Sequence, residues 1–85
     1  MTLEYAHEAK KQLKKLDHQS ALDIKKYMDE VQKLDDPRDR GRELTSNLSG
    51  LWRYRVGDYR LICEIKDEKM IILVLVIGHR KEIYR

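Results

Sequence analysis

Three arginines stand close together in a segment that alternates apolar and cationic residues, from residue 52 to residue 60. Arg53 and Arg55 fall two positions apart, so on a β-strand they share one face while the apolar residues around them face the other way. The Gly57-Asp58 pair suits a two-residue type II′ hairpin, which places Arg60 directly opposite Arg55. Like charges that face each other across strands repel and cost stability. The pattern therefore predicts a sheet face that binds an anion.

A second polar group follows Gly78, a residue type at which a strand can bend sharply. It contains a histidine, an arginine, a carboxylate and a phenol, namely His79, Arg80, Glu82 and Tyr84. If the apolar strand that precedes Gly78 pairs with the second strand of the hairpin, the expected register places His79 and Arg80 close to the Gly57-Asp58 turn. We therefore expect this group to converge with the three arginines at one site.

Such a site suits chemistry on phosphate without a metal, because the convergent residues include neither a second carboxylate nor a Cys/His ligand set. RNA can be cleaved in this way when its own 2′-hydroxyl attacks the adjacent phosphorus, leaving a cyclic phosphate and a 5′-hydroxyl. Arginines hold phosphate and neutralise growing charge, but they are poor proton donors. A histidine titrates near neutral pH, so His79 is the natural acid or base, and Tyr84 and Glu82 are the other candidates.

Purely structural roles stay open for the same residues. Aromatic side chains of a hairpin more often pack in a core than stack on an unpaired base, although both are compatible with this pattern. Arg53 and Arg55 also suit an edge strand whose charge discourages aggregation. Glu82 suits a salt bridge with one of the arginines.

Hydrophobic spacing predicts the elements that position these residues. Residues 2–5 are compatible with a short strand, and residues 6–16 repeat apolar side chains at intervals of three and four, as an amphipathic helix does. Asp17 is a suitable N-cap for a second helix with the same spacing, which ends before Pro37. Two helices with almost no linker predict a helical hairpin.

The segment from residue 38 to residue 50 has the composition of a loop. It carries arginines at positions 38, 40 and 42, which we expect to be solvated and paired with nearby acids. The expected acidic partners are Asp36, Asp39 and Glu43.

The segment from Met70 to Ile77 is apolar at every position, which predicts a strand in the interior of the sheet. A tight turn that pairs Lys66 with Lys69 would then divide the sheet into two faces. The face expected beneath the helices carries Trp52, Tyr54, Tyr59, Leu61, Cys63, Met70, Ile72, Val74 and Val76. The opposite face is expected to carry Arg53, Arg55, Arg60, Ile62, Ile71, Leu73, Leu75 and Ile77.

The bulk composition fits one small domain, residues 1–85, with a net charge of +3 and a pI near 9.0 that lean toward anionic partners. The single cysteine, Cys63, lies in an alternating apolar run and is predicted to be a buried thiol in a reducing cytoplasm. The N-terminal segment has no signal-peptide pattern, and the longest apolar run is too short to span a bilayer.

Four blocks of sequence, in this order and spacing, resemble the RelE/ParE superfamily of toxin-antitoxin toxins, and more closely the RelE-type mRNA interferases. The blocks are residues 9–17, residues 34–37, residues 50–61 and residues 78–84. The resemblance implies an α+β fold of order βααβββ, with an antiparallel sheet packed against an N-terminal helical hairpin. It also implies a metal-independent, cofactor-free endoribonuclease that cuts mRNA in the ribosomal A site.

The resemblance carries over residue by residue. Arg53 and Arg55 stand where the family pattern has lysines, Arg60 and Arg80 match arginines, and Tyr84 matches a tyrosine close to the C-terminus. Because arginine is restricted to electrostatics and orientation, proton transfer is expected to pass to His79, Glu82 or Tyr84.

The family further implies a cognate RelB-like antitoxin, which could cover the apolar stretch of Ile62, Ile71, Leu73 and Leu75. Two other functions are compatible with the sequence. One is a ParE-like toxin that inhibits DNA gyrase without nuclease activity, and the other is an inactive RNA-binding relative.

Overall fold

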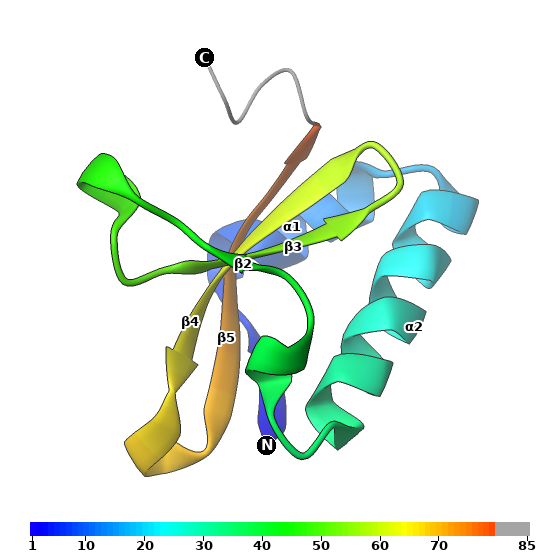
Figure 1. Ribbon diagram of the computed structural model, residues 1–85. Coiled ribbons are helices and arrows are strands. Elements are labelled where there is room, and N and C mark those ends of the chain that lie inside the picture. The colour runs from blue at the N-terminus through cyan, green and yellow to red at the C-terminus, as the bar shows by residue number, and fades with distance from the viewer. Residues whose placement is uncertain (80–85) are drawn as a thin grey trace.

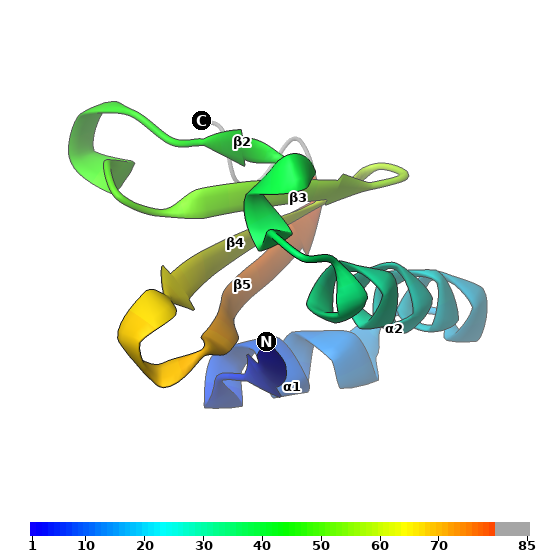
Figure 2. The same ribbon diagram turned by 60° about the horizontal axis from the view of Figure 1, so that its bottom comes forward.

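The computed structural model describes residues 1–79, which form two layers, a five-stranded sheet and a pair of helices (Figure 1). The elements follow the order β1 (Thr2–Tyr5), α1 (His7–Lys15), α2 (His18–Lys33), β2 (Arg42–Glu43), β3 (Trp52–Val56), β4 (Tyr59–Lys66) and β5 (Ile71–His79). Short 3₁₀ turns at Pro37–Asp39, Ser46–Leu48 and Asp67–Lys69 separate the later elements. Both helices lie on the same side of the sheet (Figure 2).

The predicted α+β class and the βααβββ order are confirmed, with two additions. The strands lie in the order β1-β5-β4-β3-β2, and β1 runs parallel to β5 whereas every other pair is antiparallel. β2, only two residues long, is an edge strand in the segment predicted as a loop. None of the helices within residues 1–79 has the length and apolar character that a membrane span requires.

The helical hairpin forms as its spacing predicts. Asp17 is the N-cap of α2, and its carboxylate accepts a hydrogen bond of 3.0 Å from the backbone N–H of Ser20, which satisfies one of the free donors at the start of the helix. Ile24, Met28 and Val31 occupy one face of α2 and are fully buried. The helix layer therefore presents a continuous apolar face to the sheet.

The hairpin of β3 and β4 has the predicted register. Arg55 pairs with Arg60, Tyr54 with Leu61, and Arg53 with Ile62. Gly57 begins the turn with φ of +59°, a left-handed conformation that glycine adopts without steric cost, as a type II′ turn requires.

The predicted pairing of β4 with β5 is wrong, because the turn is longer than expected. Lys66 pairs with Ile71, and Met70 instead closes the turn in the left-handed conformation with 58% of its surface exposed. The register then shifts at a β-bulge between Ile62 and Cys63. Both changes follow from a strand that is apolar throughout, since such a strand carries no alternation to fix its register.

The bulge changes which residues of β5 face the helices. Val74 pairs with Cys63, but the next pairs are Val76 with Ile62 and Ile77 with Leu61, so Leu75 is the additional residue. Ile77, predicted on the open face, is buried in the core, whereas Val76 is only half-buried.

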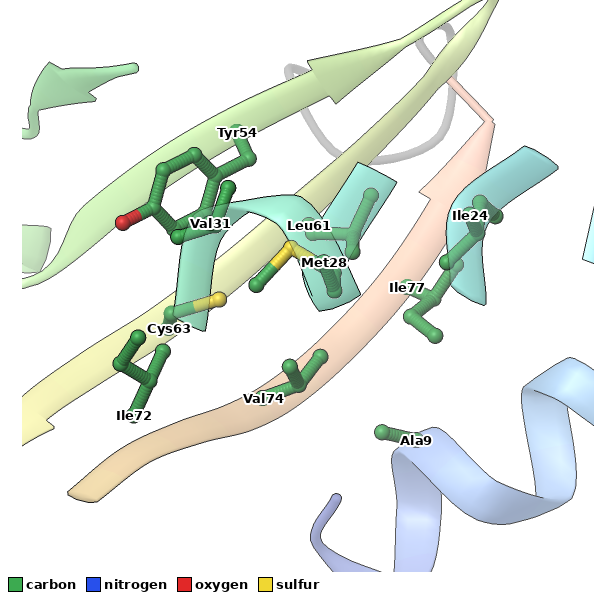
Figure 3. Close-up of a cluster of buried hydrophobic side chains, with 10 residues drawn as sticks. All are labelled: Ala9, Ile24, Met28, Val31, Tyr54, Leu61, Cys63, Ile72, Val74 and Ile77. Atoms are coloured by element: carbon green, nitrogen blue, oxygen red, sulfur yellow. The ribbon is translucent and has the colours of Figure 1, made fainter. Parts of the chain in front are cut away.

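The core lies between the helices and the inner face of the sheet (Figure 3). It contains Ala9, Ile24, Met28, Val31, Tyr54, Leu61, Cys63, Ile72, Val74 and Ile77. Cys63 is buried as predicted, and burial raises the pKa of its thiol to about 12, which keeps it protonated and unreactive. The Tyr54 hydroxyl donates a 2.6 Å hydrogen bond to the Pro37 carbonyl, so this core aromatic also anchors the segment after α2.

Candidate functional site

Four arginines line one pocket of about 440 Å³ at the β2 side of the sheet. Its lining consists of Tyr27, Gly41, Arg42, Arg53, Arg55 and Arg60. Cavities of this size hold small ligands in many proteins. Because guanidinium groups are planar hydrogen-bond donors with a fixed positive charge, this lining is suited to a phosphate.

The strands bring these arginines together in two directly opposed pairs. Arg42 of β2 pairs with Arg53 of β3, and Arg55 of β3 pairs with Arg60 of β4. Like charges repel across a sheet, and the strand pairing nevertheless holds the four arginines at one edge. The three predicted arginines therefore do converge, and Arg42 is a fourth that sequence reasoning placed in a solvated loop.

Arg60 is the most buried of the four, with only 7% of its surface exposed. Its neighbour on β5 is Gly78, which has no side chain to compete for the space above the sheet. A charge shielded from water interacts more strongly with an anion, because the local dielectric constant is lower. Of the four guanidinium groups in this pocket, that of Arg60 is therefore the most shielded from water.

Gly41 fixes the approach of β2 to β3. Its φ is +80°, and a Cβ at this position would lie 2.4 Å from the Arg53 carbonyl oxygen and 2.6 Å from the Trp52 Nε1. The Trp52 indole N–H also donates a 2.7 Å hydrogen bond to the Arg40 carbonyl oxygen. Only glycine fits this crossing, which places Arg42 beside the other pocket arginines.

The remaining loop arginines have structural partners, but not the predicted ones. Arg38 forms a bidentate pair with Asp67, at 2.9 and 2.8 Å, and its N–H groups hold the pKa of that carboxyl below its usual range. Arg40 pairs with Glu30 of α2 at 3.0 Å. Asp36 instead accepts a hydrogen bond from the Arg38 backbone N–H and caps the 3₁₀ turn. These arginines thus tie the segment after α2 to distant parts of the fold.

His79 reaches the predicted end of the sheet but lies outside the arginine pocket. It pairs with Tyr59, and the two rings meet edge to face with centroids 5.8 Å apart. Because side chains alternate along a strand, Tyr59 and His79 face the side opposite to Arg60. They line a separate pocket of about 360 Å³, together with Gln12, Lys15, Leu16, Ile77 and Gly78.

The other predicted site residues, Arg80, Glu82 and Tyr84, lie outside the described residues. Within residues 1–79, no group of three His, Cys, Asp or Glu side chains is arranged to hold a metal ion. The described part of the site is therefore cationic, with one phenol from the helix layer.

A sequence profile for the family described as the ParE toxin of type II toxin-antitoxin systems, parDE, matches residues 3–84. Toxin RelG of Mycobacterium tuberculosis is 40% identical over 45 residues, which is 53% of this chain and 52% of that protein. The match thus spans about half the length of this curated relative.

Solved structures show the same fold. The toxin-antitoxin complex RelBE2 from Mycobacterium tuberculosis contains a chain with a TM-score of 0.83 and 26% identity, covering 95% of this chain and 92% of that one. The isolated Escherichia coli RelE toxin has a TM-score of 0.74 and 23% identity, covering 98% of this chain and 89% of that one. With the family profile extending over nearly all of the sequence, the chain belongs to the RelE/ParE superfamily of type II toxin-antitoxin toxins.

Proposed function

We propose that this toxin is a ribosome-dependent mRNA endoribonuclease that works without a metal. The observation that carries the proposal is the convergence of Arg42, Arg53, Arg55 and Arg60 on one pocket. The fold tolerates two opposed arginine pairs there, and an RNA phosphate would relieve their repulsion.

In this mechanism the arginines hold the scissile phosphate and orient it for attack by the adjacent ribose 2′-hydroxyl. The new bond forms between that oxygen and phosphorus, and the bond to the 5′-oxygen breaks, giving a 2′,3′-cyclic phosphate and a 5′-hydroxyl. Guanidinium groups neutralise the charge that grows on the phosphoryl oxygens. Arg80, the residue after His79 in the sequence, is assigned to the same task.

Two proton transfers remain, since the 2′-hydroxyl loses a proton and the 5′-oxygen gains one. Arginine is too weak an acid for either transfer. We assign them to Glu82 and Tyr84, because His79 faces the opposite side of the sheet from the arginine pocket.

The test is incubation with ribosomes programmed with a defined mRNA, followed by analysis of the fragment ends. We expect 5′-hydroxyl and cyclic phosphate ends, and no cleavage where the nucleotide before the cut carries a 2′-deoxyribose. Arg55→Ala should lower the single-turnover rate by about 100-fold or more, as loss of an electrostatic donor does in other enzymes. Arg38→Ala, which removes an arginine outside the pocket, is the matched control. Intact message with the unmodified protein would reject the proposal.

Inhibition of DNA gyrase is the second candidate, because the matching family profile is that of the ParE toxins. A supercoiling assay separates the two functions, since a gyrase inhibitor blocks supercoiling and leaves ribosome-bound mRNA intact. An inactive RNA-binding relative would do neither, and would leave bacterial growth unchanged when expressed.

We also propose a RelB-like antitoxin as partner, because solved relatives have been determined in complexes with RelB. The open face of the sheet offers half-buried apolar residues, Ile71 and Leu73, beside the more deeply buried Ile62. A toxin acting on ribosomes would act in the cytoplasm. Co-expression with the antitoxin should restore growth, and substitution of Leu73 by Asp should weaken that rescue.

A further inference from the structure

Tyr27 of α2 enters the arginine pocket from the helix layer. Tyr27 is only half-buried, whereas the neighbouring Met28 on the same helix is fully buried. β2 pairs only with Trp52 and Arg53, so within residues 1–79 the rest of β3 has no strand beyond it at this edge. Tyr27 lines the pocket beside that uncovered edge.

The Tyr27 ring is held from two sides. It meets the Tyr54 ring edge to face, with centroids 6.0 Å apart and planes at 63°. The Arg40 guanidinium lies 5.3 Å from the Tyr27 ring centroid, and its own position is fixed by the 3.0 Å ion pair with Glu30. This support restricts the ring before any ligand arrives, which reduces the entropy lost on binding.

The Tyr27 hydroxyl adds a property that the arginines lack. A guanidinium only donates hydrogen bonds, whereas a neutral phenol both donates and accepts. Burial raises the pKa of Tyr27, so the group stays neutral at physiological pH. Within residues 1–79, the other side chains that line the pocket are arginines, and glycine has none. The phenol oxygen, which the Arg40 guanidinium also approaches as a hydrogen-bond donor, is therefore the side-chain acceptor in this pocket to which a ligand hydroxyl can donate.

We propose that Tyr27 is a specificity-determining residue that accepts a hydrogen bond from a ribose 2′-hydroxyl next to the phosphate held by the arginines. This inference rests on the proposed action on RNA and extends it to discrimination between RNA and DNA. A site built to bind a substrate hydroxyl disfavours the analogue that lacks it, because a polar group is then left without its partner.

The test uses two ligands that contain no scissile bond, adenosine 3′-phosphate and 2′-deoxyadenosine 3′-phosphate. Their dissociation constants are measured by NMR titration of the unmodified protein and of Tyr27→Phe, which keeps the ring contacts with Tyr54 and Arg40. We expect the unmodified protein to bind the ribonucleotide about 2- to 10-fold more tightly, the range of one net hydrogen bond. Tyr27→Phe should bind the two ligands equally.

Tyr5→Phe is the matched control, because Tyr5 lies on β1 at the opposite edge of the sheet. It should keep the preference for the ribonucleotide. Equal binding of both ligands by the unmodified protein, or a preference retained in Tyr27→Phe, would overturn the role of Tyr27. Cleavage of ribosome-bound mRNA by the unmodified protein is measured separately, so the proposed nuclease can stand when this assignment fails.

Discussion

Replacing Arg55 with Gln should stabilise the fold while it removes function. Arg55 faces Arg60 directly across the hairpin, and both line the pocket with Arg42 and Arg53. Directly opposed like charges destabilise paired strands, and favourable cross-strand pairs are worth roughly 0.2–1 kcal/mol, so by a repulsion of similar size the free energy of unfolding of Arg55→Gln should rise by about 0.5 kcal/mol. The rate of RNA cleavage should fall by about 100-fold or more, because Gln keeps hydrogen-bond donors but carries no charge.

Urea unfolding at low and at high salt checks the electrostatic origin of this gain. Salt screens the repulsion, so the difference between Arg55→Gln and the unmodified protein should shrink toward zero near 1 M salt, where the Debye length is about 3 Å. Arg38→Gln is the matched control with the opposite sign, because it breaks the ion pair with Asp67 and should lower stability. If Arg55→Gln lowered stability by the same amount at every salt concentration, the arginines would be supporting the fold and the argument for the site would fail.

Three further predictions concern the scaffold. Gly41→Ala should lower the free energy of unfolding by about 1–3 kcal/mol, measured by urea titration, because the added Cβ meets the Arg53 carbonyl and the φ of +80° is strained for alanine. Tyr5→Phe should leave thermal stability unchanged or raise it, because the Tyr5 hydroxyl is buried with no hydrogen-bond partner in residues 1–79 and burial raises its pKa to about 12. The Arg38 pair lowers the pKa of Asp67, so its stabilising effect should be present above about pH 4 and lost as the pH falls further. Urea midpoints measured down to about pH 2.5 should then show the gap between Arg38→Gln and the unmodified protein closing.

Local chemistry explains why the β3–β4 hairpin could be predicted in detail. The Gly57-Asp58 turn fixes the register, and alternation assigns Arg53 and Arg55 to one face. β5 offered neither signal, because it is apolar at nearly every position and the extra residue at Leu75 depends on packing against both neighbours. His79 was therefore placed at the correct end of the sheet, but its pocket could not be derived.

Sequence reasoning missed two residues of the site, Arg42 and Tyr27, for different physical reasons. β2 is two residues long, too short for any periodicity to show, so Arg42 was indistinguishable from a solvated loop arginine. The one available signal was Gly41 next to it, a glycine at a close approach of two backbones. Tyr27 lies at the border of the apolar face of α2, where spacing alone does not separate a core ring from one at a pocket edge.

Because β1 pairs in parallel with β5, the sheet cannot be completed until β5 has been synthesised. β5 is synthesised after every other element described here, yet it lies between β1 and β4 and supplies Ile72, Val74 and Ile77 to the core. A nascent chain that lacks it leaves β1 without a strand to join and the helices without much of their packing surface. Pairing between such distant segments is slow to form. The toxin is thus expected to become harmful only after β5 has been synthesised and has paired with β1 and β4. While that slow pairing proceeds, a partner already present in the cell could bind the chain.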